Sequence, residues 1–391
     1  MQNLICGKVL TFAAAGVLYD QSLILEQDKI LDILPSEEAR RRYQNAPVTD
    51  YSNFTAMPGM IDCHVHLCFD GGHDPLNTIL KERTDSSRLL LRSIENGAKA
   101  LAVGVTTVRD CGAAGEYIYE LRDAINSGRI LGARILTSGT PITTTGGHCW
   151  FLNGCADSKE EIKKEVRKKV QNGADFIKVM ASGGYMTPGS SSDIVQYSDE
   201  EMVALCQEAH AHNKKVAAHA LSRESILQCI RAGVDTIEHC ILRDHAESDT
   251  TIFEYIRDHG AVYSPAFTAS CFRESARTEN AVKRLTSVRE MCRAGIKICA
   301  GTDAGCADTP FGSYVEMLEF LHEYLHLSQE ETLLSATVNA AKCIGMDRLL
   351  GKLEPGKIAD ILILKNDPLE SIENLQTLQA VYQNGKSRPL P

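Results

Sequence analysis

The amino-acid sequence predicts an α/β fold: a closed (β/α)8 TIM barrel with a small β-sandwich domain formed from both chain ends. Between residues 57 and 345, eight short apolar segments alternate with amphipathic segments, a pattern typical of βαβ units and a parallel sheet. Eight strand–helix units over roughly 250 residues are what a closed barrel requires. Residues 1–56 and 346–391 instead contain only short apolar runs broken by Gly and Asp, which favours β-structure at both ends.

The chain ends are expected to form one domain. The N-terminal strands are predicted within Leu4–Phe12 and Ser22–Leu34, and the C-terminal strands within Asp360–Leu364 and Ala380–Tyr382. Because chain termini usually lie close together, we expect residues 1–56 and 346–391 to build the small domain. The barrel would then be residues 57–345.

The barrel elements follow one another regularly. The expected strands are Gly59–Leu67, Val105–Asp110, Arg134–Ser138, Asp175–Ala181, Lys215–Ala220, Thr236–Cys240, Ala261–Phe267 and Lys297–Asp303. Helices between them are expected at Ser158–Asn172, Asp199–Asn213, Ser222–Ala232 and Asn280–Ala294. Ser158 and Ser198 are typical N-cap residues, and glycine follows several helix ends.

Composition narrows the possible partners. The formal net charge is −10, with 43% apolar and 24% charged residues, which indicates a globular protein and argues against nucleic acid or an anionic membrane surface as partner. The fourteen cysteines are spread singly, as reduced thiols of a cytoplasmic enzyme would be. No stretch has the ~20 apolar residues of a membrane span, so a cytoplasmic location is expected.

Metal-binding side chains fall at the ends of the predicted strands. His64 and His66 are two residues apart on the first strand, so both imidazoles point to the same side. His219, His239 and Asp303 end the fifth, sixth and eighth strands. Strand ends converge at one mouth of a barrel, where active sites of this architecture lie. The set therefore predicts a metal centre at that mouth.

Lys178 lies inside the apolar strand Phe176–Met180. A charged lysine in a dry interior is unfavourable without a partner or a change of chemical state. Two explanations stay open: an ion pair with a nearby carboxylate, or reaction of the amine with carbon dioxide to give an anionic carbamate that bridges two cations.

These motifs resemble the amidohydrolase superfamily, over nearly the whole chain from the β-rich start to the tail Gly351–Leu364. The resemblance implies that His64 and His66 bind a first metal, that carboxylated Lys178 bridges, and that His219 and His239 bind a second. It also implies that Asp303 contacts the first metal and transfers protons. Two divalent ions, zinc first by ligand type, would be the cofactors.

Within the superfamily, the chain is similar to the group related to imidazolonepropionase, which includes dipeptidases and ochratoxin-type amidases. The segments that carry this similarity are Gly104–Asp110, Thr145–His148, Lys178–Gly184 and Gly301–Gly305. The resemblance implies a hydrolase that cleaves amide or peptide bonds of small substrates bearing a carboxylate, with water activated by two metal ions. Lys178 favours this two-metal reaction over that of imidazolonepropionase itself, which holds one metal and lacks the lysine.

Candidate substrate contacts lie near the other strand ends. His148 follows the third strand in a glycine-containing loop, Tyr185 follows Gly183 and Gly184, and Arg109 ends the second strand. Each could bind a substrate carboxylate. Each also has a structural alternative: a solvent-exposed loop histidine, a packing tyrosine, and an arginine paired with Asp110 or another buried acid.

Other functions remain open from the sequence. A cyclic amidase or a deaminase of the same superfamily is the alternative enzyme, and a non-catalytic metal-binding protein on the same fold is a further one. The expected partner is a small molecule, and a homo-oligomer is expected because barrels of this kind often associate.

Overall fold

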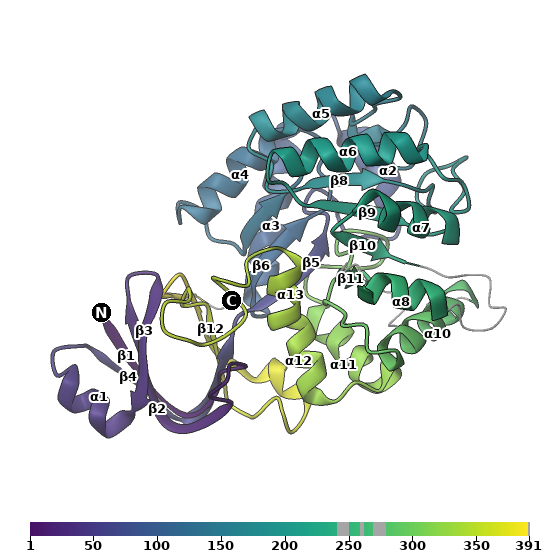
Figure 1. The fold of residues 1–391 in the computed structure, drawn as a ribbon. Helices are drawn as coiled ribbons and strands as arrows, with labels where there is room; N and C mark the ends of the chain where they lie inside the picture. The colour runs from purple at the N-terminus through teal and green to yellow at the C-terminus, as the bar shows by residue number, and fades with distance from the viewer. Residues whose placement is uncertain (241–249, 259–261, 269–278, 390–391) are drawn as a thin grey trace. The chain divides into compact units, whose positions relative to one another are not determined.

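The computed structural model describes residues 1–240, 250–258, 262–268 and 279–389, and its strands form three sheets (Figure 1). One sheet has seven strands in the order β14-β13-β12-β4-β1-β2-β3, the second is β11-β10-β9-β8 and the third is β5-β6-β7. The first contains both chain ends, and the other two supply the strands of the barrel.

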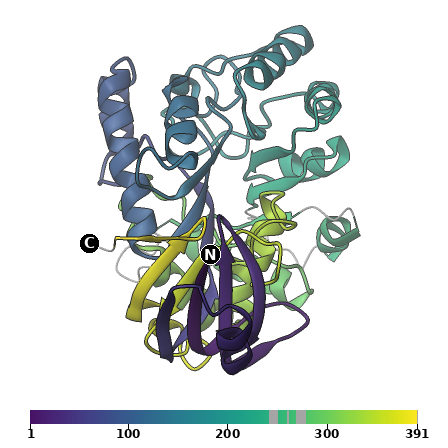
Figure 2. The same cartoon turned by 90° about the vertical axis from the view of Figure 1, so that its left-hand side faces the viewer.

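The seven-stranded sheet joins segments more than 300 residues apart in the sequence. Its strands are β1 (Gln2–Leu10), β2 (Val17–Glu26), β3 (Lys29–Pro35), β4 (Val48–Pro58), β12 (Ile361–Leu364), β13 (Leu378–Gln383) and β14 (Lys386–Arg388). β4 pairs in parallel with β1 and antiparallel with β12, with Pro58 opposite Ile361. Figure 2 shows the N-terminal and C-terminal strands side by side. The predicted pairing of the two ends is confirmed.

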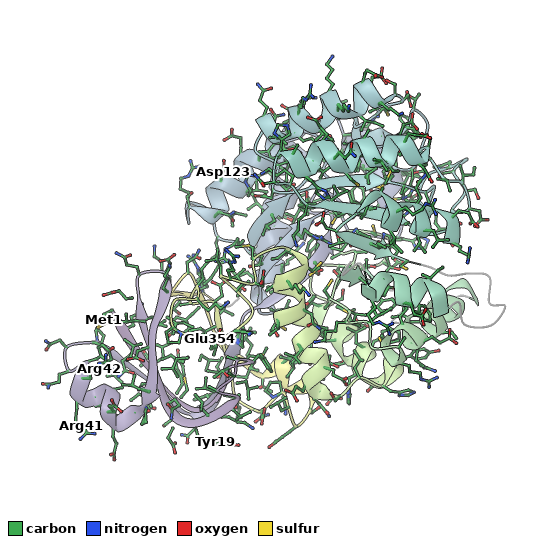
Figure 3. The ribbon with its side chains drawn as sticks, viewed as in Figure 1. Met1, Tyr19, Arg41, Arg42, Asp123 and Glu354 are labelled. Carbon is green, nitrogen blue, oxygen red and sulfur yellow. The ribbon has the colours of Figure 1, made fainter. Side chains whose placement is uncertain are left out.

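Alternating side chains of this sheet make its core. Leu4, Leu23, Ile361 and Ile363 are fully buried in one cluster. The short helix α1 (Ser36–Arg42) follows β3 and buries only Ala39. Its Arg41 and Arg42, like Tyr19 on β2, project outward (Figure 3).

The barrel strands are short, and every described position is buried except Leu136 on β7, which is half-buried. They are β5 (Met60–Val65), β6 (Val105–Asp110), β7 (Arg134–Thr137), β8 (Ile177–Met180), β9 (Val216–Ala220), β10 (Thr236–His239) and β11 (Val262–Ser264). Burial on both faces is typical of parallel strands covered by helices. Seven of the predicted strands therefore occur, with bounds shifted by a few residues; Ala261, the first residue predicted for the seventh, lies outside the described residues.

The eighth predicted strand, Lys297–Asp303, is not a continuous strand. Ile298 bridges Tyr263, and Ala304 bridges Val65. Between these bridges, the backbone N–H of Cys63 donates to Ala300 O at 2.9 Å and that of Asp303 to His64 O at 2.8 Å. This segment thus connects β11 to β5 through single hydrogen bonds.

The gap between β7 and β8 is bridged in a similar way. Ile142, beyond the end of β7, forms a parallel bridge with Val179, and the Ile142 N–H donates to Lys178 O at 2.8 Å. With both connections made, the parallel strands are consistent with the TIM barrel that the sequence predicts.

Several helices begin at a residue whose side chain accepts a hydrogen bond from the first turn of the helix. In the barrel region they are α2 (Pro75–Glu82), α3 (Ser86–Ala102), α4 (Tyr117–Asn126), α5 (Lys159–Gln171), α6 (Asp199–Ala211), α7 (Arg223–Ala232), α8 (Thr250–Asp258) and α10 (Glu279–Arg293). Helices α11 (Tyr314–Leu325), α12 (Gln329–Ala336) and α13 (Val338–Cys343) follow. Ser158 and Ser198 cap α5 and α6 as predicted, and Gly233 ends α7 with φ 83°. Helices α5 and α6 lie side by side beyond β8 (Figure 1).

The described residues fall into two compact units. One comprises residues 1–61, 99–107 and 314–391, and the other residues 62–98 and 108–313. The second unit holds every candidate site residue. The domain bounds at 56/57 and 345/346 stay a prediction. Within the described residues, no helix is both long and apolar enough to cross a membrane.

Candidate metal centre

His64 and His66 project from the end of β5 toward Asp303. The Nε2 atoms of the two histidines lie 3.6 and 3.4 Å from Asp303 Oδ1. One ligand atom from each of the three residues lies within 4.8 Å of the others, and all three side chains are buried. Imidazole nitrogen and carboxylate oxygen at this spacing are a donor set suited to a divalent cation such as zinc.

His219 and His239 continue this group of imidazoles from β9 and β10. The His239 ring centroid lies 5.0 Å from that of His64 and 4.7 Å from that of His219. Four histidines from three strands are therefore brought together, as the convergence of strand ends predicts.

Lys178 contributes a buried amine from β8. Its side chain is 1% exposed, and Nζ has no hydrogen-bond partner among the described residues. Of the two explanations that the sequence left open, an ion pair is thus not observed with any described carboxylate. A buried donor without a partner is rare in folded proteins and usually has a functional role, and a metal-bridging carbamate is one chemical form of Lys178 that would explain it.

Asp62 connects β5 to the segment that precedes Asp303. The carboxylate of Asp62 accepts the Thr302 hydroxyl at 2.6 Å, the Thr302 N–H at 3.1 Å and the His64 N–H at 3.2 Å. Burial raises the pKa of Asp62 to about 7, against the lowering effect of these hydrogen bonds. Asp62 thereby holds β5 and the segment that carries Asp303 together. Sequence reasoning missed it, although it precedes His64 by two residues.

Two of the candidate ligands have an unusual backbone conformation. His239 and Asp303 have φ values of 68° and 56°, in the left-handed region that non-glycine residues seldom adopt. Such conformations persist where the surrounding structure enforces them, and they cluster at functional sites.

The environment keeps His64 and His219 neutral, the form that binds metals. Burial, followed by the charge of Lys178, lowers the pKa of His64 well below its usual value. Burial, followed by the neighbouring His148 and Lys178, does the same for the pKa of His219. For Asp303, burial alone would raise the pKa, but the hydrogen bond with His66 lowers it below its usual value. Asp303 is therefore an ionised carboxylate at neutral pH.

Glu238 and Arg109 form a buried pair beside His64. Glu238 Oε2 lies 2.6 Å from His64 Nδ1, and Glu238 Oε1 accepts a hydrogen bond from Arg109 Nη2 at 2.6 Å. Arg109 is 3% exposed. The structure therefore shows, of the two roles considered for Arg109, the pairing with a buried acid. Sequence reasoning missed Glu238, whose place immediately before His239 was the available signal.

His148 lies at the same mouth, whereas Tyr185 is on its outer edge. The His148 ring is 5% exposed, and its centroid is 4.5 Å from that of His219. Its Nδ1 is 3.1 Å from the Thr187 hydroxyl. Burial and the charge of Lys178 lower the pKa of His148 to about 4. Tyr185, in the loop that follows β8, is 59% exposed.

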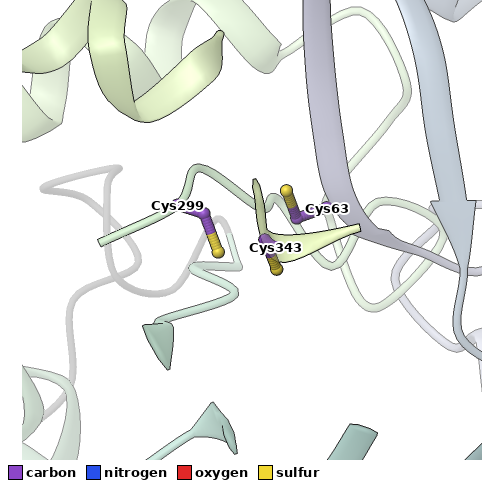
Figure 4. A group of neighbouring side chains, drawn as sticks. All are labelled: Cys63, Cys299 and Cys343. Carbon is purple, nitrogen blue, oxygen red and sulfur yellow. The ribbon is translucent and has the colours of Figure 1, made fainter. Parts of the chain in front are cut away.

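Two cysteines lie just before candidate ligands in the sequence. Cys63 on β5 and Cys299 in the segment before Asp303 are fully buried (Figure 4). Cys299 Sγ donates to the Tyr263 carbonyl at 3.3 Å. Burial as small apolar residues is the usual state of thiols in a core.

The fold and this donor set define the class of barrel hydrolases with a metal-binding histidine cluster. The chain matches the Amidohydrolase family over residues 55–388 and belongs to it. It is thus a hydrolase of a family that acts on C–N bonds.

Several characterised proteins are similar over almost the whole chain. The ochratoxinase of Aspergillus niger is 29% identical, covering 92% of this chain and 81% of its own. The imidazolonepropionase of Picrophilus torridus is 23% identical, covering 94% and 92%. Among solved structures, an Xaa-Pro dipeptidase with bound methionine superposes with a TM-score of 0.86 at 26% identity and 99% coverage of both chains. A prolidase complexed with N-methylphosphonate-L-proline gives a TM-score of 0.83 at 28% identity, again covering 99% of both chains.

Proposed function

We propose that this protein is a binuclear metal-dependent hydrolase that cleaves the amide or peptide bond of small carboxylate-bearing substrates, dipeptides or N-acyl amino acids. The observation that carries the proposal is the buried Nζ of Lys178, which lacks a hydrogen-bond partner among the described residues and shares the barrel mouth with four histidines. A pair of cations bridged by carboxylated Lys178 would explain why an otherwise unfavourable amine is buried at this position.

The ligands divide into two sets in this proposal. His64, His66 and Asp303 would hold one ion, His219 and His239 the other, and carboxylated Lys178 would join them. Zinc is the expected metal because the donors are imidazoles and carboxylates. When bound, two such cations polarise a carbonyl oxygen and lower the pKa of water toward neutrality.

Side chains of the protein would then transfer protons and bind the substrate. Asp303, held ionised, would accept a proton from the attacking water at a carboxylate oxygen and return it to the leaving nitrogen, the alternation of base and acid that amide hydrolysis needs. His148, held neutral, would donate a hydrogen bond from Nε2 to the substrate. Tyr185 at the outer edge would contact the substrate carboxylate.

The relatives support the choice of substrate class. Methionine, bound in the Xaa-Pro dipeptidase, and N-methylphosphonate-L-proline, bound in the prolidase, both carry a free carboxylate. A cyclic amidase or deaminase would not need a second metal, so metal stoichiometry separates it from the proposed dipeptidase-like enzyme.

The test combines metal content with substrate preference. Protein purified without chelators should contain two zinc-type ions per chain, and its metal content should fall in a Lys178→Ala variant. It should hydrolyse N-acyl amino acids or dipeptides and lose this activity when the substrate carboxylate is amidated. One ion per chain that is unaffected by Lys178→Ala, or equal hydrolysis of the amidated substrates, would contradict the proposal.

A further inference from the structure

We propose that Glu238 and Arg109 are positioning residues that fix the tautomer of His64, with the proton on Nδ1 and the lone pair of Nε2 directed into the metal centre. The inference deepens the proposed function, on which it rests for the role of the Nε2 lone pair. The juxtaposition that carries it is a buried arginine, glutamate and histidine hydrogen-bonded in series.

The hydrogen bonds around Glu238 decide which group its second carboxylate oxygen must bind. Its carboxylate is fully buried. Oε1 accepts from both Arg109 Nη2 at 2.6 Å and the Thr236 hydroxyl at 2.8 Å. A carboxylate that faces a guanidinium is ionised and can only accept. Its other oxygen, Oε2, therefore requires a donor, and His64 Nδ1 lies 2.6 Å away.

The same hydrogen bond determines the state of both ring nitrogens of His64. A neutral imidazole carries one proton, and the hydrogen bond made by one nitrogen decides the state of the other. With the proton on Nδ1, Nε2 keeps its lone pair. This is the nitrogen that faces Asp303 Oδ1 at 3.6 Å. A carboxylate partner of this kind orients a metal-binding histidine and raises its basicity.

Arg109 makes the arrangement rigid because it contacts two strands other than its own, β5 and β10. From β6, its Nε donates to Cys63 O on β5 at 2.6 Å, and its Nη1 donates to the Thr236 hydroxyl on β10 at 3.0 Å. Its guanidinium also lies 5.3 Å from the ring centroid of Phe176. The planar fork of arginine suits such simultaneous contacts, which lysine could not reproduce. Arg109 thus fixes the position of Cys63, which precedes His64, relative to Glu238, which lies beside the His64 ring.

The arrangement predicts an unusual response to Glu238→Gln. An amide has a single oxygen, and the Arg109 guanidinium together with the Thr236 hydroxyl would claim it. The amide NH₂ group would then face His64 and donate to Nδ1, which forces the ring proton onto Nε2. The variant should therefore bind metal about 10- to 100-fold more weakly at the first site, the range typical of lost second-sphere partners.

Removing the arginine as well should reverse this effect. In the double variant Arg109→Met with Glu238→Gln, the amide can turn its oxygen to His64 Nδ1 and its NH₂ group to the Thr236 hydroxyl. Metal affinity should return to within a few-fold of the wild-type value. A purely structural role of the pair predicts no such recovery of metal affinity in folded protein.

The experiment reads the tautomer directly. ¹⁵N-histidine-labelled, metal-free protein is examined by NMR, with a His64→Asn variant to assign the His64 signals, and Zn²⁺ affinity is measured by competition with a chromophoric chelator. We expect His64 to carry its proton on Nδ1 in the wild type and in the double variant, and on Nε2 in Glu238→Gln. Glu208→Gln, which alters the exposed Arg167–Glu208 pair, is the matched control and should change neither readout.

The results separate this inference from the proposed function. A wild-type His64 protonated on Nε2 overturns the inference without recourse to any variant, even if Glu238→Gln does not fold. Wild-type metal affinity in folded Glu238→Gln overturns it as well. If the wild type binds no metal but carries the proton on Nδ1, the proposed function fails while the tautomer assignment stands.

Discussion

Replacing Lys178 by methionine should stabilise the metal-free protein while removing its second metal ion. The amine is 1% exposed and has no hydrogen-bond partner among the described residues. Methionine has a similar length and shape but no polar group. The change therefore removes an unsatisfied donor without opening a large cavity.

The size of the expected stabilisation follows from the free-energy cost of burying the Lys178 amine without a hydrogen-bond partner. A buried polar group without a partner costs about 1–3 kcal/mol, and a charged one more. The free energy of unfolding of the metal-free protein should rise by at least about 1 kcal/mol in Lys178→Met, or by roughly 2–4 °C in Tm for a unit of this size. Most core substitutions destabilise, so the sign is diagnostic.

The assay is thermal unfolding of chelator-treated protein in bicarbonate-free buffer, together with metal analysis after reconstitution. Lys169→Met is the matched control: Lys169 is equally buried, but its Nζ donates to the Thr140 hydroxyl at 2.7 Å and pairs with Glu165 at 3.3 Å. It should lose stability by about 1–3 kcal/mol. If Lys178→Met is less stable than the wild type without metal, or still binds two ions, the reasoning about the unsatisfied amine is refuted.

Three further predictions concern other parts of the site and of α5. Asp303→Asn should keep most of its metal but lower kcat by about 10²–10⁴-fold, the usual contribution of a general acid–base; steady-state kinetics at matched metal content checks this, and full activity would remove Asp303 from that role. Gly184→Ala would place a Cβ 2.5 Å from Cε1 of His148, so KM should rise while metal content is unchanged, and an unaltered KM would show that His148 does not contact the substrate. Burial lowers the pKa of Lys169 from 10.5 to about 8, against the opposing effect of Glu165; the unfolded chain therefore binds more protons between these pH values. The stability of the wild type relative to Lys169→Met should accordingly rise from pH 8 to 10.5, by roughly 3 kcal/mol at most, and a flat difference in denaturant titrations would contradict it.

The sequence by itself determined the architecture and the candidate ligands. Hydrophobic periodicity, glycine and serine at helix ends, and short apolar strands are local signals. They placed seven barrel strands within a few residues of their observed bounds. The candidate ligands were equally visible because parallel strands end at one mouth. A His or Asp at the end of such a strand is brought near the others by the parallel arrangement alone.

Only the tertiary structure decided how these groups are held. The acid that pairs with Arg109 proved to be Glu238, 129 residues away. The carboxylate that binds the residue before Asp303 is Asp62, whose bond to Thr302 spans 240 residues. The eighth strand is reduced to single bridges with Tyr263 on β11 and Val65 on β5. Such partnerships depend on the register between strands distant in sequence, which a local pattern does not encode. The sequence thus identified which side chains meet at the mouth, and the packing of the barrel decided which nitrogen, oxygen or amine each one presents there.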